Sequence, residues 1–411
     1  MTRQYTKKVL RRAPLLIGTV AFVIRAVLLY ATKPYAITMS YEPNNVAQAV
    51  AAGLGLANPY GCVTGPSGHL APLFPWFSGA LLAITGAYWG LAKSLVSITV
   101  VSLLWAAMPR ASRMLGFTRA AGVLAGFAGA LLPVAMSTEL RGDWEAPYIA
   151  AALLIVAMQA VRVERMPVLR ATAGVRHGFW WGVFLLGMPN ALLLIPGWMY
   201  RVCRERWRAC TGYILAAAAA VVLVVTPYVI YSRIRVGHWF FIRDNFGLEL
   251  FVSNRPESAL VMMENMAGVM NKYHPLLSPE ACAEVQRLGE QRYEKERLHE
   301  ALQFIQADPL TFISRAAQHG LWQIFPWTTD WKRNILEWAI ALAALAGCVI
   351  AIRQRRPYIW FLIGGAGLYL LPYLFVQGSP RYRYPVWWLL VLLGAFAVRV
   401  VLRRWGSGPS R

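Results

Sequence analysis

Acidic residues are scarce in this 411-residue chain, which holds 19 Asp and Glu against 41 Lys and Arg. Only 15% of its residues are charged and 57% are hydrophobic, whereas about a quarter of the residues in an ordinary soluble domain are charged. This shortage excludes an ordinary soluble domain. The net charge of +22 does not indicate a nucleic-acid partner, because much of it lies in short basic clusters beside apolar runs, as in the cytoplasmic loops of membrane proteins.

Cysteine is also rare. The five cysteines form no CxxC pair and show no metal-ligand spacing, which excludes a cysteine-rich metal site. Cys62 and Cys282 fall in segments that we predict to lie outside the membrane, where they either pair or remain separate thiols. The other three are expected to be ordinary thiols: Cys203, Cys210 and Cys348.

Long apolar runs are abundant, and a transmembrane helix needs roughly 20 such residues. The first run follows a basic stretch and is expected to be a retained signal anchor. We predict an all-α polytopic membrane protein with about ten transmembrane helices. The apolar segments are 14–31, 70–85, 92–108, 120–136, 146–161, 178–198, 211–231, 335–352, 358–376 and 385–402.

The basic loops set the expected topology, because Lys and Arg favour the cytoplasmic side. Both termini are predicted inside, with outer regions at 32–92, at 137–145, in the large polar loop from Ser232 and near Gln377. The corresponding division is 1–231, an N-terminal membrane module with the first outer loop; 232–330, the large outer loop; and 331–411, the C-terminal helices.

Two apolar segments do not fit as simple crossings. The loop 109–113 is basic and is placed inside, so segment 70–85 is predicted to lie along the outer face. Segment 178–198 has basic loops on both sides, and Pro189 with Asn190 interrupts it. It is interpreted as two half-spans forming a hairpin, with a single crossing as the alternative.

Polar residues gather near the predicted outer membrane boundaries. A carboxylate close to hydrocarbon costs free energy unless it is paired or hydrated, so these residues are functional candidates. For Glu42 the alternative is a solvated loop acid, and Glu139 and Arg141 can pair with each other. Arg25 either reaches the outer interface or faces the helix bundle. The outer set is Glu42, Glu139, Asp143, Glu145, His69, Arg141, Arg381 and Arg383.

Four stretches, in this order, carry a resemblance to a known family: SYEPNNVAQAVAAGLGLANPYGCVTGPSGHLAPLFPWFSGALLAITG, GDWEAPYIAAALL, RDNFGLELFVSN and SPRYRYPVWWLLVLLGAF. Together they resemble the bacterial branch of the GT-C glycosyltransferases. The chain is similar to the dolichyl-phosphate-mannose protein mannosyltransferases and the aminoarabinose transferase of lipid A. The resemblance implies a GT-C fold with juxtamembrane helices at the outer face of the bacterial cytoplasmic membrane.

The resemblance also implies a reaction. A polyprenyl-phosphate-linked monosaccharide would be the donor, and a lipid, polysaccharide or protein would be the acceptor. Direct attack by an acceptor hydroxyl in one step would invert the anomeric centre. Membrane lipids are the remaining expected partners. A transporter or flippase for a lipid-linked sugar is the alternative, although the chain shows none of the internal repeats common in transporters.

Site residues follow from the same resemblance. Glu42 stands where the family has an acid in the first outer loop, usually Asp, that acts as general base or metal ligand. Glu145, or Asp143 in its place, matches a second catalytic acid at the start of a later span. Arg381 or Arg383 matches a donor-phosphate contact, a role suited to the fixed charge and paired donors of arginine.

Four further assignments are open. His69 is either a phosphate or acceptor contact or an interfacial packing residue, and Lys93 either binds the donor phosphate or extends to the outer interface. Glu42 and Glu145 can hold a divalent cation such as Mg²⁺ or Mn²⁺ through oxygen ligands, although no cofactor is certain. In the third stretch of the resemblance, three polar residues are expected to pack the loop: Asp244, Asn245 and Glu249.

Overall fold

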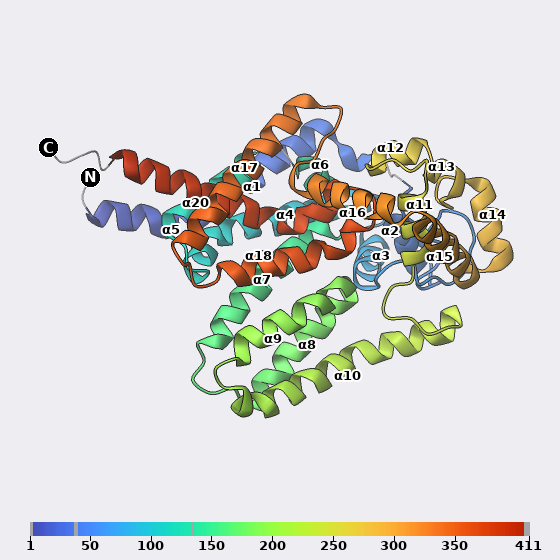
Figure 1. Ribbon diagram of the computed structural model, residues 1–411, viewed down its shortest axis with the longest axis horizontal. Helices are drawn as coiled ribbons and strands as arrows, with labels where there is room; N and C mark the ends of the chain where they lie inside the picture. The colour runs from blue at the N-terminus through green and yellow to red at the C-terminus, as the bar shows by residue number, and fades with distance from the viewer. Residues whose placement is uncertain (1–2, 37–39, 133–134, 407–411) are drawn as a thin grey trace.

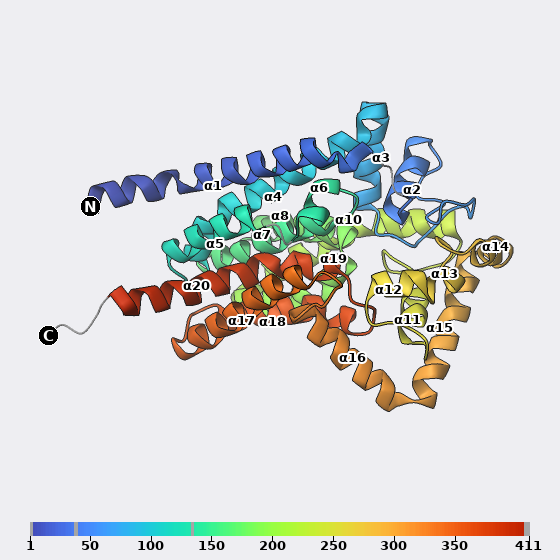
Figure 2. The same ribbon diagram turned by 90° about the horizontal axis from the view of Figure 1, so that it is seen from above.

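The protein is described from a computed structural model covering residues 3–36, 40–132 and 135–406. Within these ranges the regular structure is helical, and β-structure is confined to two isolated bridges. Figures 1 and 2 show long helices running side by side along the longest axis, with shorter helices capping one end. The prediction of an all-α polytopic protein is confirmed.

Six apolar segments of the described chain are long enough to cross a membrane. The main helices of these segments are α1 (Arg3–Thr32), α4 (Trp89–Met114), α7 (Ala146–Glu164), α10 (Thr211–Val236), α17 (Trp331–Arg353) and α20 (Trp387–Gly406). Four shorter helices run among them: α5 (Arg119–Leu131), α8 (Ala171–Gly187), α9 (Ile195–Cys203) and α18 (Ile359–Leu370).

Small residues let these helices approach closely, as is common where lipid removes the hydrophobic drive for association. A Cβ atom at Gly347 of α17 would collide with the backbone carbonyl of Leu393 on α20. A Cβ atom at Gly129 of α5 would collide with the ring of Trp105 on α4. Trp105 is itself almost fully buried in the core that joins α1, α4, α5 and α20.

Both termini lie at the same end of the bundle, and the turns after α4, α7, α9 and α17 lie toward that end (Figure 1). These turns carry the basic clusters of the sequence. The end that holds the termini is therefore the basic end of the molecule. We call it the basic end below.

The opposite end is a cap of short helices (Figure 2). Segment 70–85 forms α3 (Leu73–Thr85), which lies across the long axis and is separated from α4 at Gly86, where φ is +52°. The segment predicted to lie along the outer face thus forms a separate helix at an angle to α4, and its placement at the membrane surface stays a prediction. The rest of the cap consists of α2 (Glu42–Ala51), α11 (Phe246–Asn254), α12 (Met262–Ala267), α13 (Met270–Tyr273), α14 (Pro279–Leu288) and α15 (Glu290–Ala307), and α16 (Pro309–Ile324) leads back to the bundle.

The break predicted in segment 178–198 is confirmed. Helix α8 ends at Gly187, a 3₁₀ turn covers Pro189–Leu194, and α9 follows. The Trp198 ring of α9 packs against Trp181 and His177 of α8, with ring centroids 5.7 and 6.2 Å apart. The two helices therefore form the predicted hairpin.

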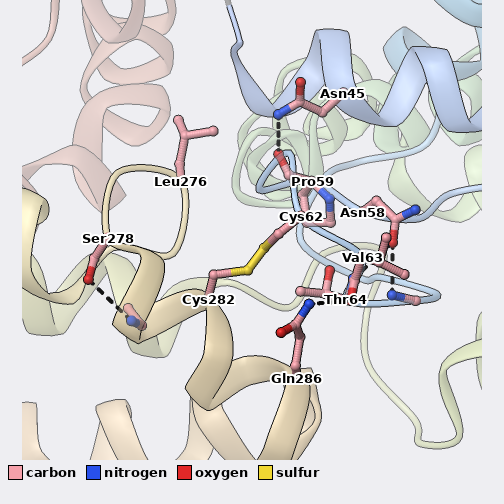
Figure 3. Close-up of a disulfide and its surroundings, with 12 residues drawn as sticks. Asn45, Asn58, Pro59, Cys62, Val63, Thr64, Leu276, Ser278, Cys282 and Gln286 are labelled. Atoms are coloured by element: carbon pink, nitrogen blue, oxygen red, sulfur yellow. Dashed lines mark hydrogen bonds between the residues drawn. A yellow bond between two sulfur atoms is a disulfide. The ribbon is translucent and has the colours of Figure 1, made fainter.

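A disulfide joins Cys62, in the loop after α2, to Cys282 in α14 (Figure 3). Hydrogen bonds support the same junction: Gln286 donates to the carbonyl of Val63 (3.0 Å), and Asn45 donates to the carbonyl of Pro59 (2.8 Å). The pairing that the sequence left open is thus formed. It fastens the first outer loop to the large loop across 220 residues of sequence.

Candidate active site

Glu42 is the first residue of α2, and Pro43 follows it at a position where the missing N–H costs no helical hydrogen bond. Its side chain is only 6% exposed. Burial raises the pKa of the Glu42 carboxyl above its usual value, while the positive charges of Arg381 and Arg243 oppose this rise. A buried carboxylate with a raised pKa is suited to accept a proton.

Two histidines lie beside this carboxylate. The ligand atoms of Glu42, His69 and His274 all lie within 4.8 Å of one another. His274 follows α13, and its Nε2 atom is 3.7 Å from Oε1 of Glu42, while the Leu276 amide donates to Nδ1 (3.2 Å). Nδ1 of His69 lies 3.1 Å from the hydroxyl of Tyr60.

Both imidazoles are neutral at physiological pH. Burial lowers the pKa of His274 to about 4 and lowers the pKa of His69 well below its usual value. One carboxylate and two neutral imidazoles fit a divalent transition ion such as Zn²⁺, whose catalytic sites have three protein ligands and one open position. The predicted metal pair was Glu42 with Glu145. In the described chain, Glu42 instead groups with the two histidines.

Arg381 reaches the same site from α19 (Pro380–Arg383), just before α20. Its guanidinium carbon lies 3.6 Å from the centre of the Trp144 ring, and Nη2 donates to the Tyr382 hydroxyl (3.0 Å). It interacts electrostatically with Glu42 and Glu145. Its buried Nε has no hydrogen-bond partner among the described residues. We call Glu42, His69, His274 and Arg381 the Glu42 cluster.

Arg383 points elsewhere. It pairs with Glu337 of α17, which also accepts a hydrogen bond from Arg333 (2.7 Å). Glu337 is 3% exposed and Arg383 is 4% exposed. The predicted phosphate contact at Arg383 is therefore replaced by a buried ion pair that joins α17 to the start of α20.

Lys93 and Asp143, both predicted as site residues, pair with each other. Nζ of Lys93 lies 2.7 Å from Oδ1 of Asp143 and 2.6 Å from Oδ1 of Asn44, and it sits 4.0 Å from the centre of the Trp89 ring. This contact neutralises the two charges and leaves neither group free for the donor. Because Asn44 belongs to the first turn of α2, the pair also anchors the helix that presents Glu42.

A second buried charge group lies within the bundle, and we call it the Arg25 cluster. Arg25 is fully buried and donates to Glu139 (2.7 Å), which also accepts from the Tyr384 hydroxyl (2.7 Å). The remaining donors of Arg25 reach backbone carbonyls of α1 and α5 (3.1–3.2 Å). Arg25 therefore faces the bundle, and Glu139 pairs with it rather than with Arg141.

Sequence reasoning missed two charged residues of the site. Nε of Arg243 donates to the His69 carbonyl (2.9 Å), and its charge acts on Glu42. Glu249, expected to pack the loop, is 9% exposed and interacts electrostatically with Arg381. Both residues lie in the RDNFGLELFVSN stretch, and its part in the family resemblance was the sequence signal that could have identified them. Asp244 packs the loop as expected, bonding His238 (2.6 Å).

Glu290 fixes the loop that carries His69. Its Oε1 atom accepts the backbone N–H of Gly68 (2.7 Å), and it is 5% exposed. Burial raises the pKa of Glu290 to about 7, while hydrogen bonds from Ser67 and Gly68 oppose the rise. A Cβ atom at Gly68 would lie 2.5 Å from the end of the Phe240 ring, so a larger residue here would displace that ring.

An apolar cavity of 350 Å³ opens beside Glu145, between α3, α4, α7 and α8. Glu145 is its only charged lining residue, and the others include Phe74, Phe77, Tyr148 and Phe184. A larger cavity of 480 Å³ lies between α7, α9, α18 and α20, but none of the Glu42 cluster lines it. None of the Glu42 cluster lines the smaller cavity either, but Glu145 does, and Glu145 interacts electrostatically with Glu42 and Arg381. The smaller cavity is therefore the one connected to the clustered charges.

Comparison with known proteins identifies the architecture. No protein-family model and no curated protein matches the chain. A solved structure of the oligosaccharyltransferase AglB from Archaeoglobus fulgidus, in complex with an inhibitory peptide and a dolichol-phosphate, does match. It is 13% identical with a TM-score of 0.59, and the match covers 99% of this chain and 53% of that one. The chain has the GT-C fold.

A second oligosaccharyltransferase structure from Archaeoglobus fulgidus, in the apo form, agrees. It is 11% identical with a TM-score of 0.56, and the match covers 98% of this chain and 52% of that one. The chain thus spans about half the length of the structures it matches. At this level of identity the likeness establishes the GT-C fold, and the reaction must be argued from the site.

Proposed function

We propose that the protein is an inverting glycosyltransferase that moves a monosaccharide from a polyprenyl-phosphate donor to an acceptor hydroxyl. The observation that carries this proposal is the Glu42 cluster: a buried carboxylate, two neutral histidines and an arginine. Glu145, which interacts electrostatically with this cluster, lines an apolar cavity. The related AglB structure, which contains a dolichol-phosphate and a peptide, supports a lipid-linked donor. A lipid, polysaccharide or protein acceptor remains part of the proposal.

The donor phosphate is assigned to Arg381 and Arg243. Both are positively charged, and both act electrostatically on Glu42. Arginine offers two parallel N–H donors to phosphate oxygens, and its charge stabilises the negative charge that develops when the phosphate leaves. The polyprenyl chain would lie in the apolar cavity beside Glu145, whose lining matches a hydrocarbon tail.

Glu42 is assigned as the general base. The acceptor oxygen attacks the anomeric carbon, its proton passes to the carboxylate, and the bond to the phosphate oxygen breaks with its electron pair on the polyprenyl phosphate. Glu145 is the second acid within electrostatic reach of Glu42. A divalent cation held by Glu42, His69 and His274 would supply further positive charge beside the leaving phosphate.

The proposed location is the cytoplasmic membrane of a bacterium, with both termini in the cytoplasm and the Glu42 cluster outside. The basic turns at the end that holds the termini support this orientation. The disulfide in the cap supports it independently, because disulfides persist in oxidising compartments.

The test is turnover of radiolabelled polyprenyl-phosphate sugars by the purified protein, scored as released polyprenyl phosphate. We expect Glu42→Gln to lower kcat by about 10²–10⁴-fold. Glu205→Gln is the matched control, because Glu205 lies in an exposed turn at the basic end with its side chain 79% exposed. Full turnover in the Glu42 variant would overturn the assignment of the base, and sugar movement across vesicles with an intact donor would instead identify a flippase.

A further inference from the structure

A basic pocket lies at the basic end of the bundle, where the start of α5, the turn between α17 and α18, and the last turns of α20 meet. Its volume is 260 Å³. Three of its seven lining residues are arginines and none is acidic. The lining residues are Thr118, Gln354, Arg356, Phe396, Arg399, Val400 and Arg403.

Arg356 is held in place by neutral groups. Nη1 donates to the Gly116 carbonyl (3.1 Å), and Nε and Nη2 donate to Oε1 of Gln354 (3.2 and 2.9 Å). The guanidinium carbon lies 5.1 Å from the centre of the Phe396 ring. These contacts fix the orientation of the Arg356 guanidinium group. None of them involves an acid, so they do not balance its positive charge.

The backbone conformation of the turn between α17 and α18 also helps to position Arg356. Arg355 ends α17 in the left-handed region with φ of +49°, a conformation that favours glycine. The amide of Arg356 then bonds the carbonyl of Ala351 (3.0 Å) and closes the helix end. The turn thereby directs Arg356 toward α20 despite the cost of a non-glycine residue in this conformation.

Helix α20 brings two more positive charges to the pocket. Arg399 and Arg403 are four residues apart, so their side chains share one helix face, where like charges repel. A phosphate between Arg356 and Arg399 would be attracted by the positive charges of both. Apolar side chains next to them on α20 are open to the surroundings: Val398, Val401 and Leu402 are 44%, 42% and 52% exposed.

We propose that this pocket binds the phosphate headgroup of an anionic phospholipid from the membrane leaflet at the basic end. The lining of the pocket holds three arginines and no acid, which matches a phosphate in charge. Arg356 uses three of its five N–H donors for Gly116 and Gln354, which leaves one on each Nη atom for a phosphate oxygen. Basic pockets between helices on the cytoplasmic side are a known form of headgroup site. The acyl chains would lie along the exposed apolar residues of α20. This site is independent of the proposed glycosyl transfer.

The test measures thermal unfolding of the purified protein in neutral detergent as phosphatidylglycerol is titrated in. We expect the Arg356→Gln/Arg399→Gln variant to need at least roughly tenfold more lipid than the wild type for the same rise in Tm. Arg170→Gln/Arg208→Gln is the control, because it removes the same charge from exposed positions at the basic end. The control should respond like the wild type. Arg399→Gln alone should show part of the effect, because Arg399 makes no hydrogen bond within the described residues and its loss leaves the turn that holds Arg356 intact.

Four results would overturn the proposal. One is an equal loss of response in the control pair, which would mean a diffuse charge effect. Another is an equal rise in Tm with phosphatidylcholine, which carries no net charge. The third is saturation of the effect by inorganic phosphate without lipid, which would make free phosphate the ligand. Retention of the lipid response by the pocket variant would equally exclude the site.

Discussion

The Glu42 cluster and the Arg25 cluster are both buried, yet their polar atoms are satisfied to different degrees. In the Arg25 cluster, the guanidinium of Arg25 donates to the Glu139 carboxylate and to three backbone carbonyls. The Tyr384 hydroxyl donates a further hydrogen bond to Glu139. In the Glu42 cluster, the His274 imidazole lies 3.7 Å from the carboxylate of Glu42, and the buried Nε of Arg381 has no hydrogen-bond partner among the described residues. A saturated network holds helices together, whereas an unsaturated one leaves donors and acceptors for a substrate.

This contrast matters because a buried unpaired charge is costly, and a fold that keeps one needs compensation elsewhere. The cap provides that compensation through the disulfide and through Glu290, which fixes the loop before His69. Rigid support from the cap and the bundle thus keeps the Glu42 cluster assembled without neutralising it. The following changes test the division between structural and functional charge.

Glu139→Gln should have the largest effect on stability. It leaves Arg25 buried at the centre of the bundle without its counter-charge, and breaking such a pair costs about 3–5 kcal/mol. We expect a large fall in Tm in detergent, measured by intrinsic fluorescence, with turnover per folded molecule unchanged. Normal Tm with lost turnover would place Glu139 in the reaction and break the comparison.

Arg381 and Arg383 allow the same comparison between a functional and a structural charge within one short helix, α19. Arg381→Gln should lower kcat by about 10²-fold or more, because it removes a preorganised donor to the leaving phosphate, and it should leave Tm nearly unchanged. Arg383→Gln should do the reverse, since it removes a buried ion pair with Glu337 that joins α17 to the start of α20 and leaves Glu337 with Arg333 alone. The measurement is kcat and Tm for both variants side by side. Matching phenotypes in the two variants would contradict the separate roles.

The sequence predicted the features that depend on local pattern, and a family resemblance supplied the rest of the predicted site. Long apolar runs predict long helices because lipid cannot satisfy backbone polar groups, and Pro189 predicts the helix break because it lacks an N–H. Glu42 and Arg381 were found through a resemblance to a family. Their meeting across the chain is a property of the fold and could not be derived from local pattern.

The sequence could not predict which charged side chains pair with each other. Lys93 and Arg383 stand at the predicted boundary, as a phosphate ligand would, but their pairing with Asp143 and Glu337 depends on helix packing between distant segments. His274 had no local signal at all. It reaches Glu42 only because the large loop folds over α2, a contact that the disulfide secures.

The disulfide allows a test of that support. Replacing Cys62 and Cys282 together by serine should lower the free energy of unfolding by about 2–4 kcal/mol, because the unfolded chain regains the freedom of a long closed loop. Activity should fall as well, since His274 and the loop of His69 lose their tether. The measurement is Tm and turnover with and without reductant. Reductant should change the wild type and not the variant; a response in both would implicate another thiol.

Glu290 offers the subtlest test, through pH. Its pKa is raised to about 7 in the folded protein because of burial, and lies near 4.5 when unfolded, so the folded state binds the proton more tightly. Stability from this group is complete below the unfolded pKa and is lost as pH rises toward 7. We expect the free energy of unfolding to fall by roughly 2–2.5 kcal/mol between pH 5 and 7.5, and Glu290→Gln to flatten that slope. Because Gln keeps an acceptor for the Gly68 amide, the variant should retain turnover at neutral pH. If the slope persists in Glu290→Gln, another buried acid titrates in this window, and Glu294, whose pKa burial also raises, is the next to replace.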